Sequence, residues 1–152
     1  MVILKIKEIL VESATAKTKK VLRDVPLLVN FTFQSSPMET VRTLIYYNDY
    51  FITFYNLQSE KVKIKIDYVL YVLTVAKRIP KQYFQHITDT NGLYEIRIKS
   101  QGNIFRIFCC FDQGNIVVLF NGFQKKSQKT PQSEIKKAMN IMHDYFLNKR
   151  FN

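Results

Sequence analysis

The sequence predicts an α+β fold in which an antiparallel sheet of about four strands is combined with an N-terminal helical hairpin and a C-terminal helix. Segments rich in β-branched and aromatic residues follow one another between residues 93 and 123, and tight turns separate them. In two other segments, 59–78 and 135–146, apolar residues instead recur at three- and four-residue steps. Runs of strands and helices that are separated along the chain are typical of the α+β class.

The length of the chain favours one domain preceded by an extension. With 152 residues, 47% of them hydrophobic, the composition is that of a folded chain long enough for one core. Residues 1–37 include a stretch that fits either a short helix or a strand, and they end in the turn-rich sequence QSSP. We assign them to an N-terminal extension of open status and residues 38–152 to the domain, with Met38 as an alternative start.

The first elements expected in the domain are a strand and two helices. Residues 41–47 (VRTLIYY) are mostly β-branched or aromatic and indicate a strand. In residues 59–78 the helical period competes with a strand-like alternation of lysines in KVKIK. We favour a helix because the pattern exceeds the length of a typical strand, contains no Gly or Pro, and stops before Pro80. Residues 48–58 are then the other arm of a helical hairpin.

The second half of the domain is expected to be a meander followed by a helix. The strand segments are 93–99, 103–111 and 115–123, and the turns SQG and DQG are short enough to require antiparallel neighbours. Thr130 and Pro131 predict an N-cap and a first-turn proline. The apolar stripe of the closing helix consists of Ile135, Ala138, Met139, Met142, Tyr145 and Phe146.

Composition and charge restrict the partner and the environment. The chain has 23 Lys and Arg against 12 Asp and Glu, a net charge of +11, which favours nucleic acid or an acidic protein as a partner unless the surplus serves only solubility. Adjacent Cys109 and Cys110 point to opposite faces of a strand, which indicates reduced core cysteines, and no Cys or His spacing is that of a zinc site. The opening residues form neither a signal sequence nor a membrane span, so we expect a cytoplasmic protein without a membrane partner.

Charged residues within the predicted strands are the first candidates for a site. Side-chain alternation places Glu95, Arg97 and Lys99 on one face of the strand 93–99. Arg106 lies in the apolar run NIFRIFCCF, where an unpaired guanidinium would be costly. Its partner is either Glu95 across the strands or a bound anion, and the residues alone favour neither.

The segment after the last strand, NGFQKKSQKTP, is the second candidate. Lys125, Lys126 and Lys129 make it either a solvated turn or a phosphate site, and composition alone favours the turn. On the closing helix His143 is a candidate for acid–base chemistry, although a lone histidine on a helix surface is more often inert. Tyr145 falls on the apolar stripe and is expected to pack.

The order of motifs in residues 92–146 resembles the phage-derived HigB-like branch of the RelE/ParE toxin superfamily. The Leu-x-Glu-x-Arg strand, the Phe-Arg-Ile strand, a strand ending in Phe-x-Lys-Lys, the QKTP turn and EIKKA at the start of a helix follow one another as in that family. Each motif is weak, and their conjunction over this stretch is specific. The resemblance extends less distinctly back to Met38.

The resemblance implies a small RelE-like fold and a toxin of a type II toxin–antitoxin pair. Such toxins are ribosome-dependent endoribonucleases that cut mRNA without a metal or another cofactor. The 2′-OH of the RNA attacks the adjacent phosphate, and the protein stabilises negative charge and protonates the leaving 5′-oxygen. The implied partners are a cognate antitoxin protein of the helix-turn-helix kind, mRNA and the ribosome.

Carried over by motif, the resemblance makes Arg97 and Arg106 the phosphate-facing arginines, with Lys125 and Lys126 assisting. The basic residue that the family commonly has after the helix-opening alanine is absent here, which leaves His143 or Tyr145 as candidates for proton transfer. The residues expected to contact RNA are Lys99, Phe123 and Lys129. The alternatives left open are a gyrase-poisoning toxin of the ParE kind and a non-catalytic RNA-binding module.

Overall fold

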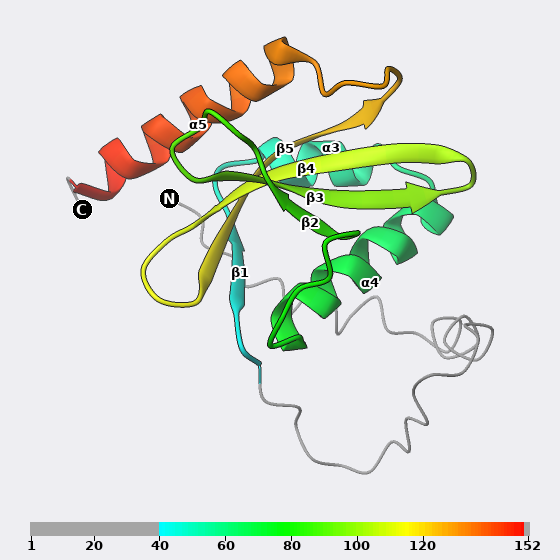
Figure 1. Cartoon of the computed structure of the whole chain (residues 1–152), viewed down its shortest axis with the longest axis horizontal. Coiled ribbons are helices and arrows are strands. Elements are labelled where there is room, and N and C mark those ends of the chain that lie inside the picture. Colours follow the sequence, from blue (N-terminus) through cyan, green and yellow to red (C-terminus); the bar gives the residue numbers. More distant parts are fainter. Residues whose placement is uncertain (1–39, 151–152) are drawn as a thin grey trace.

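In the computed structural model, which describes residues 40–150, one sheet carries helices on both of its faces (Figure 1). The predicted boundary between residues 37 and 38, and the extension itself, lie outside the described residues. In chain order the elements are β1 (Thr43–Tyr46), α3 (Tyr50–Asn56), α4 (Glu60–Val75), β2 (Phe84–His86), β3 (Leu93–Ser100), β4 (Asn103–Phe111), β5 (Ile116–Lys125) and α5 (Gln132–Arg150).

The sheet has five strands in the order β1-β5-β4-β3-β2, not about four as expected. The meander of β3, β4 and β5 is antiparallel, as predicted. The additional strand, β2, spans only Phe84–His86 and pairs with β3 at the edge. A segment this short shows no alternation of its own, so its conformation depends on a partner that the local sequence does not reveal.

The sheet is also not entirely antiparallel, because β1 pairs in parallel with β5. The chain leaves β1 through α3 and α4 and returns only after three other strands, so no short turn constrains the direction of this pair. The short β1 pairs with β5 from Ile116 to Leu119 alone. Parallel pairing to the last strand was therefore not predictable from the period of either segment.

The helices at 48–58 and 59–78 are present as α3 and α4, and α4 is a helix over the segment with the lysine alternation. It ends at Val75, and the backbone of the C-cap residue Ala76 is extended, shortly before Pro80. Lys61 is exposed and Lys63 and Lys65 are partly exposed, so the lysines sit on the helix surface, where the Lys65 ammonium lies 4.7 Å from the centre of the Tyr68 ring. That the two form an N-terminal helical hairpin stays a prediction, since the chain before residue 40 is not described.

The start of α5 differs by one residue from the prediction. The carbonyl of Pro131 accepts hydrogen bonds from the N–H groups of Glu134 (3.1 Å) and Ile135 (3.2 Å), which places Pro131 at the N-cap position. The predicted cap, Thr130, instead donates its hydroxyl to Glu95 at 3.3 Å. The competing acceptor lies on another strand, 35 residues away along the chain, so local capping rules could not anticipate it.

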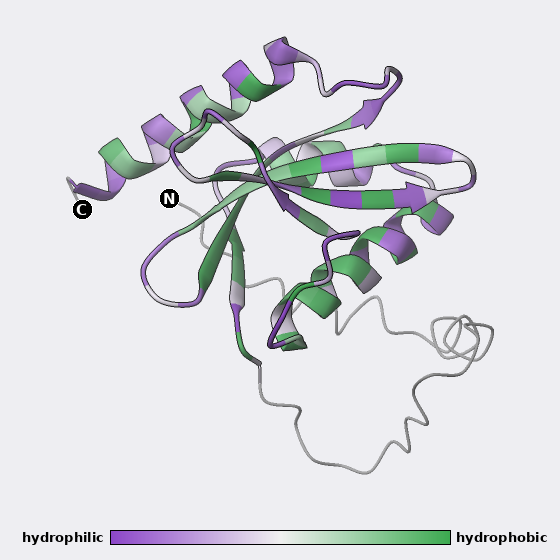
Figure 2. Cartoon of the chain, in the orientation of Figure 1, coloured by the Kyte–Doolittle hydropathy of each residue, from purple (hydrophilic) through white to green (hydrophobic). Residues whose placement is uncertain are grey.

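Two buried clusters lie on the two faces of the sheet. The cluster under α3 and α4 includes Ile96, Ile98, Ile107 and Cys109, and the cluster under α5 includes the residues Leu93, Phe108, Cys110, Ala138 and Met142. Cys109 and Cys110 thus point to opposite faces and are free, as predicted. Figure 2 shows hydrophobic and hydrophilic residues alternating along β3, the strand that carries the predicted charged face. No helix among residues 40–150 has the length and apolar character of a membrane span.

A hydrogen-bonded carboxylate joins α3 to α4. The hydroxyl of Tyr55 lies 2.9 and 3.0 Å from the two oxygens of Asp67. Burial raises the pKa of Asp67 to about 6, helped by the nearby Glu60 and opposed by the Tyr55 hydrogen bond and by Lys63. The protonated form is therefore favoured more strongly in the folded chain than in the unfolded chain.

We expect replacement of Asp67 by Asn to change how stability depends on pH. Because the folded pKa of Asp67 is raised, the protonated carboxyl contributes to the free energy of unfolding. This contribution is fully present below about pH 4 and is lost as the pH rises through about 6. Relative to the wild type, Asp67→Asn should therefore gain about 1 kcal/mol of unfolding free energy between pH 4 and pH 7, a figure reduced for solvent screening. Urea unfolding at both pH values measures this. A matched variant of an exposed carboxylate, Asp89→Asn, should show no such gain, and an equal gain in both variants would contradict the prediction.

Candidate functional site

Two adjacent rows of side chains cross the antiparallel strands near the start of α5. In one row Arg97 of β3 lies opposite Arg106 of β4, which lies opposite Phe123 of β5. In the next row Lys99 lies opposite Ile104, and Ile104 lies opposite Lys125. The structure thus brings five of the residues proposed from the sequence onto neighbouring positions of one sheet face, which is the face that α5 covers. Pairing of three strands, not sequence proximity, creates this arrangement.

A buried carboxylate, Glu95, holds the two arginines. Its Oε1 lies 3.4 Å from Nε of Arg97, and its Oε2 lies 3.2 Å from Nε of Arg106. The hydroxyl of Thr130 also donates to Oε2. Like charges directly opposite each other on neighbouring strands are destabilising, and a carboxylate between them offsets that repulsion. We refer to Glu95, Arg97 and Arg106 as the Glu95 triad.

Arg106 is the buried member of the Glu95 triad. Its side chain is 4% exposed, and its Nη1 donates to the carbonyl of Phe105 at 3.0 Å. The Nε atom is close to Glu95 but is not aligned for a hydrogen bond, so this contact is an ion pair only. Burial lowers the pKa of Arg106, while Glu95 opposes that shift. Of the two partners that the sequence left open, the structure shows the Glu95 pair.

Arg97 is the member that faces outward. Its side chain is 33% exposed, and its Nη1 donates to Oε1 of Gln85 at 2.9 Å. Gln85 lies on β2, directly opposite Glu95. Because β2 was not predicted, sequence reasoning missed this contact. Two neighbours thus hold the guanidinium of Arg97 while part of it remains accessible to a ligand.

The lysine-rich loop after β5 is organised by one of its own lysines. The ammonium of Lys125 donates to the carbonyl of Ser127 at 2.7 Å and also to the carbonyl of Gln128. The hydroxyl of Ser127 in turn donates to the carbonyl of Lys129 at 2.8 Å. Lys126 and Lys129 are exposed. Lys125 therefore stabilises the loop by binding two of its carbonyl groups, whereas Lys126 and Lys129 are open to solvent.

Phe123 is a packing residue on one side. Its ring stacks on Phe108 with centroids 5.6 Å apart and an interplanar angle of 26°. It also packs, partly buried, against the cluster under α5. One face of the ring is therefore covered by Phe108, and only the remaining surface is available to a base.

The candidates for proton transfer lie farther along α5. His143 is exposed and follows the first residue of the helix by eleven positions, roughly 16 Å along the axis, whereas the Glu95 triad meets the chain just before the helix begins. Tyr145 is buried, and its hydroxyl donates to Asp112 at 2.6 Å. Burial and this hydrogen bond raise the pKa of Tyr145 above its ordinary value. The structure brings neither residue to the two rows.

Asp112 fixes the far end of α5 and was missed by sequence reasoning. Both of its oxygens accept hydrogen bonds from Lys149, at 2.7 and 2.6 Å, in addition to the bond from Tyr145. Burial alone would raise the pKa of Asp112, but these hydrogen bonds outweigh it and hold the pKa below its ordinary value. The residue lies in the DQG turn, where only the tertiary fold brings the helix to it.

The chemistry available at the two rows suits an anionic ligand. The accessible cations are those of Arg97 and Lys99 in the rows and of Lys126 and Lys129 in the loop that follows, while the carboxylate of Glu95 is occupied by two arginines. Within the described part of the chain, no group of three or more His, Cys, Asp and Glu side chains is placed to hold a metal ion. The rows therefore form a cationic surface with an aromatic ring at one end.

The Glu95 triad leads to a stability prediction that separates its two arginines. Arg106→Met leaves a buried carboxylate without its inner partner and should lower the unfolding free energy by about 3 kcal/mol. Arg97→Met removes a partly exposed partner and should lower it by about 1 kcal/mol or less. Urea unfolding of both variants measures the difference. The control is a double-mutant cycle with Glu95→Gln. The double variant Glu95→Gln with Arg106→Met should lose less unfolding free energy than Glu95→Gln and Arg106→Met lose in sum, and an additive loss would contradict the pairing.

Comparison with known protein families agrees with the arrangement of these elements. The family model of the phage-derived protein Gp49-like family (DUF891) matches residues 55–143, more than half of the 152 residues. The match includes α4, the whole meander and the Glu95 triad. No curated protein gives a significant match. The chain therefore belongs to the phage-derived Gp49-like family (DUF891), which is a RelE/HigB-type toxin-like family.

Proposed function

We propose that this chain is the toxin of a type II toxin–antitoxin pair and that it cleaves mRNA on the ribosome as an endoribonuclease. The observation that supports this most directly is the cationic surface beside the start of α5, where Arg97, Lys99, Lys126 and Lys129 are accessible next to Phe123. Membership of a toxin-like family supports the toxin role and the presence of an antitoxin partner. Cations interleaved with an aromatic ring suit single-stranded RNA.

In the proposed reaction the 2′-oxygen of the RNA attacks the adjacent phosphorus and the bond to the 5′-oxygen breaks. The proton of the 2′-OH must leave, and the 5′-oxygen must gain one, while negative charge grows on the phosphate oxygens. Arg97 is the group that we assign to those oxygens, because its guanidinium is partly exposed and held by Glu95 and Gln85. The triad as a whole carries two positive charges and one negative charge, so it remains attractive to phosphate.

Arg106 contributes to this reaction indirectly, without contacting the RNA. Its guanidinium is buried and paired, so we assign it the positioning of Glu95 and, through Glu95, of Arg97. Lys125 likewise acts by shaping the loop that presents Lys126 and Lys129. His143 stays a candidate for proton transfer to an RNA that extends along α5, where its exposed ring is accessible. Because the proposed activity requires ribosomes, we propose that it takes place in the cytoplasm.

A second candidate function, RNA binding without cleavage, is favoured by a specific observation. Arg106 is buried against Glu95, and neither His143 nor Tyr145 lies beside the two rows. A cationic surface without a neighbouring proton-transfer group can bind RNA and need not cleave it. Direct measurement of cleavage and binding on the same variants separates the two functions.

Induction of the chain in a bacterial host, followed by primer extension on an abundant transcript, should show new 5′ ends within the coding region. Arg97→Ala should reduce cleavage about 100-fold, because a charge placed for the transition state is lost. Arg78→Ala, an exposed arginine outside the two rows, is the matched control and should cleave normally. Intact transcripts with bound RNA would favour the non-catalytic module. Intact transcripts with arrested DNA replication would instead indicate gyrase poisoning.

The exposed lysines of the loop lead to a prediction about salt. Binding of a single-stranded RNA oligonucleotide should weaken as salt increases, with a slope of about 0.7 in log K per log [salt] for each phosphate contact. The double variant Lys126→Ala with Lys129→Ala should bind more weakly and reduce the slope by about 1.4. The control is Lys61→Ala with Lys81→Ala, which removes two exposed lysines elsewhere. Equal changes in slope for both pairs would show that the loop has no special part in binding.

A further inference from the structure

Four aromatic side chains meet beside β2, on the sheet face opposite to α5. Tyr94 is the centre of this group, and its ring stacks on Phe84 with centroids 4.9 Å apart and an interplanar angle of 12°. His86 and Phe111 make edge-on contacts with the Tyr94 ring, at 5.0 and 5.2 Å between centroids. Phe84 and Tyr94 also pack, partly buried, against the core cluster under α3 and α4. We call Phe84, His86, Tyr94 and Phe111 the β2 aromatic cluster.

The outer half of the β2 aromatic cluster is open to solvent. Phe111 is 37% exposed, and His86 is exposed as well. Each of these outer rings is in direct contact with the partly buried rings, which are themselves anchored on the core. Contiguous exposed apolar surface, unlike single exposed residues, marks interaction sites. The cluster therefore presents a preformed aromatic surface to a ligand.

The β2 aromatic cluster adjoins the candidate site around the edge of the sheet. β2 is the edge strand, and no strand lies beyond it in the part of the chain that the structure describes. Side chains alternate along a strand, so Phe84 and His86 point to one face while Gln85 points to the other. Gln85 accepts the hydrogen bond from Arg97 at 2.9 Å. A single strand of 3 residues thus separates the rings from the guanidinium that we assign to phosphate.

The two carboxylates that directly follow these rings along the chain are both paired. Glu95, which follows Tyr94, is held by two arginines, and Asp112, which follows Phe111, is held by Lys149. Neither therefore repels a polyanion that approaches the rings. The net charge of +11 also opposes the association of two copies of this chain at the β2 edge and favours a polyanion there.

We propose that the β2 aromatic cluster is a subsite for an unpaired base of the RNA whose phosphate lies at Arg97. This inference rests on the proposed function and adds a contact to its substrate. The RNA passes around the open edge of β2, with its backbone beside Arg97 and Gln85 and one base stacked on Phe111 or His86. The base is flat and uncharged and needs only a ring surface, while the phosphates of the same strand bind the cations of the two rows.

The subsite selects for single-stranded RNA. In a duplex each base is already stacked between its neighbours and paired across the helix, so its ring is not free to leave the strand and lie on a side chain. Stacking on aromatic rings tolerates every base, because every base has a π-face. The subsite thus distinguishes unpaired from paired RNA without reading its sequence.

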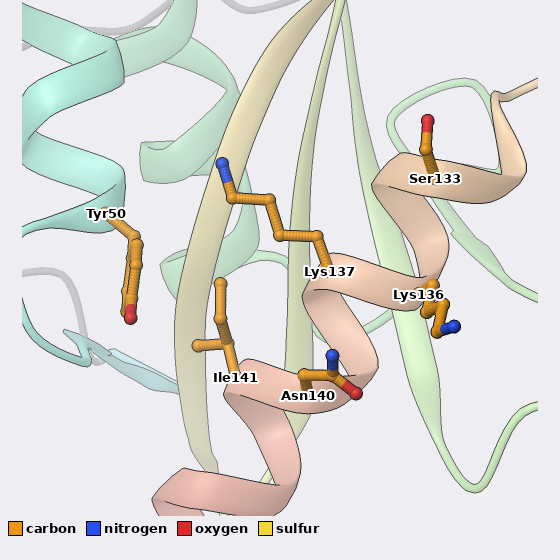
Figure 3. Close-up of a pocket in the computed structure, with 6 residues that line it drawn as sticks. All are labelled: Tyr50, Ser133, Lys136, Lys137, Asn140 and Ile141. Carbon is orange, nitrogen blue, oxygen red and sulfur yellow. The ribbon is translucent and has the colours of Figure 1, made fainter.

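Two other accessible rings are the alternatives that the test must distinguish. Phe123 lies at the end of the first row, two strands away from Arg97, and one of its faces is covered by a neighbouring ring. Tyr50, which is 40% exposed, lines a cavity of about 450 Å³ between α3 and α5. Figure 3 shows Lys137 and Ile141 of α5 pointing toward Tyr50. Each of these rings has a lysine or arginine nearby, but only the β2 aromatic cluster shares an edge strand with the contact of Arg97.

The test uses short RNA backbones that are 2′-O-methylated, so that they are not cleaved, and that carry a single base, 2-aminopurine. A matched backbone without any base has the same charge and should bind through its phosphates alone. Fluorescence anisotropy of an end label should show that the wild-type protein binds the probe with the base about tenfold more tightly. The fluorescence of 2-aminopurine should also be quenched by stacking. Placing the base at successive positions finds the one that reaches the cluster.

Substitutions at the exposed rings locate the base. Phe111→Ala with His86→Ala should reduce the tenfold advantage to within twofold and leave the affinity for the base-free backbone unchanged. Phe111→Trp should retain the advantage, since it keeps a ring. Tyr50→Ala is the control of matched exposure and should also retain it, as should Phe123→Leu. The positions of Phe111 and His86 are exposed, so the fold should be retained, which far-UV circular dichroism verifies.

Several outcomes would overturn the subsite. Equal affinity of the wild type for backbones with and without the base would remove it, and loss of the advantage in Phe123→Leu or Tyr50→Ala alone would place the base at that ring. A dimer that dissociates in the Phe111→Ala and His86→Ala variant, measured by analytical ultracentrifugation, would identify the rings as an interface between copies.

Failure of the subsite is distinguishable from failure of the proposed function. Cleavage of transcripts in the host, together with binding of the base-free backbone but no effect of the base, would overturn the subsite alone. Absence of cleavage and of binding to either backbone would overturn the proposed function and with it the subsite.

Discussion

The carboxylate of Glu95 lies between two guanidinium groups that face each other on neighbouring strands, and the arrangement of the candidate site depends on it. Without a negative charge at this position, Arg97 and Arg106 would repel each other across the ladder. The same carboxylate accepts a hydrogen bond from Thr130, just before α5. One buried group thus connects two strands, the end of the lysine-rich loop and the start of the helix.

The shared Glu95 carboxylate gives the two arginines different roles. Arg106 is buried and paired with Glu95, so its positive charge acts by holding that carboxylate in place. Arg97 reaches the surface and contacts the edge strand through Gln85. A similar division exists in the loop, where Lys125 binds the loop carbonyls and its neighbours remain accessible. In both cases one cation is bound by nearby protein oxygens and helps to position a neighbouring cation that is exposed. Identical residue types at neighbouring positions therefore have different physical roles.

The helix α5 separates two surfaces. The cationic rows lie near its start, on the sheet face that it covers, while two cavities that share Tyr50 and Lys137 lie between α5 and α3. Both surfaces share β5, whose first half pairs with β1 and whose second half has an open edge.

The sequence by itself determined those features that repeat locally. The period of two located the meander, the apolar steps located α4 and α5, and alternation placed Glu95, Arg97 and Lys99 on one face. The order of motifs also indicated the toxin-like family to which the chain belongs. Each of these signals lies within a few residues of the feature that it predicts, because backbone geometry fixes where neighbouring side chains point.

Only the tertiary structure decided the features that join distant segments. These are the parallel pairing of β1 with β5, the short strand β2 with Gln85, the choice of Glu95 as the partner of Arg106, and the hydrogen bond that takes Thr130 away from the helix cap. In each case two or more acceptors or neighbours were compatible with the local sequence. Which one is used depends on strand order and packing, and therefore on the free energy of the whole fold and not on any segment alone.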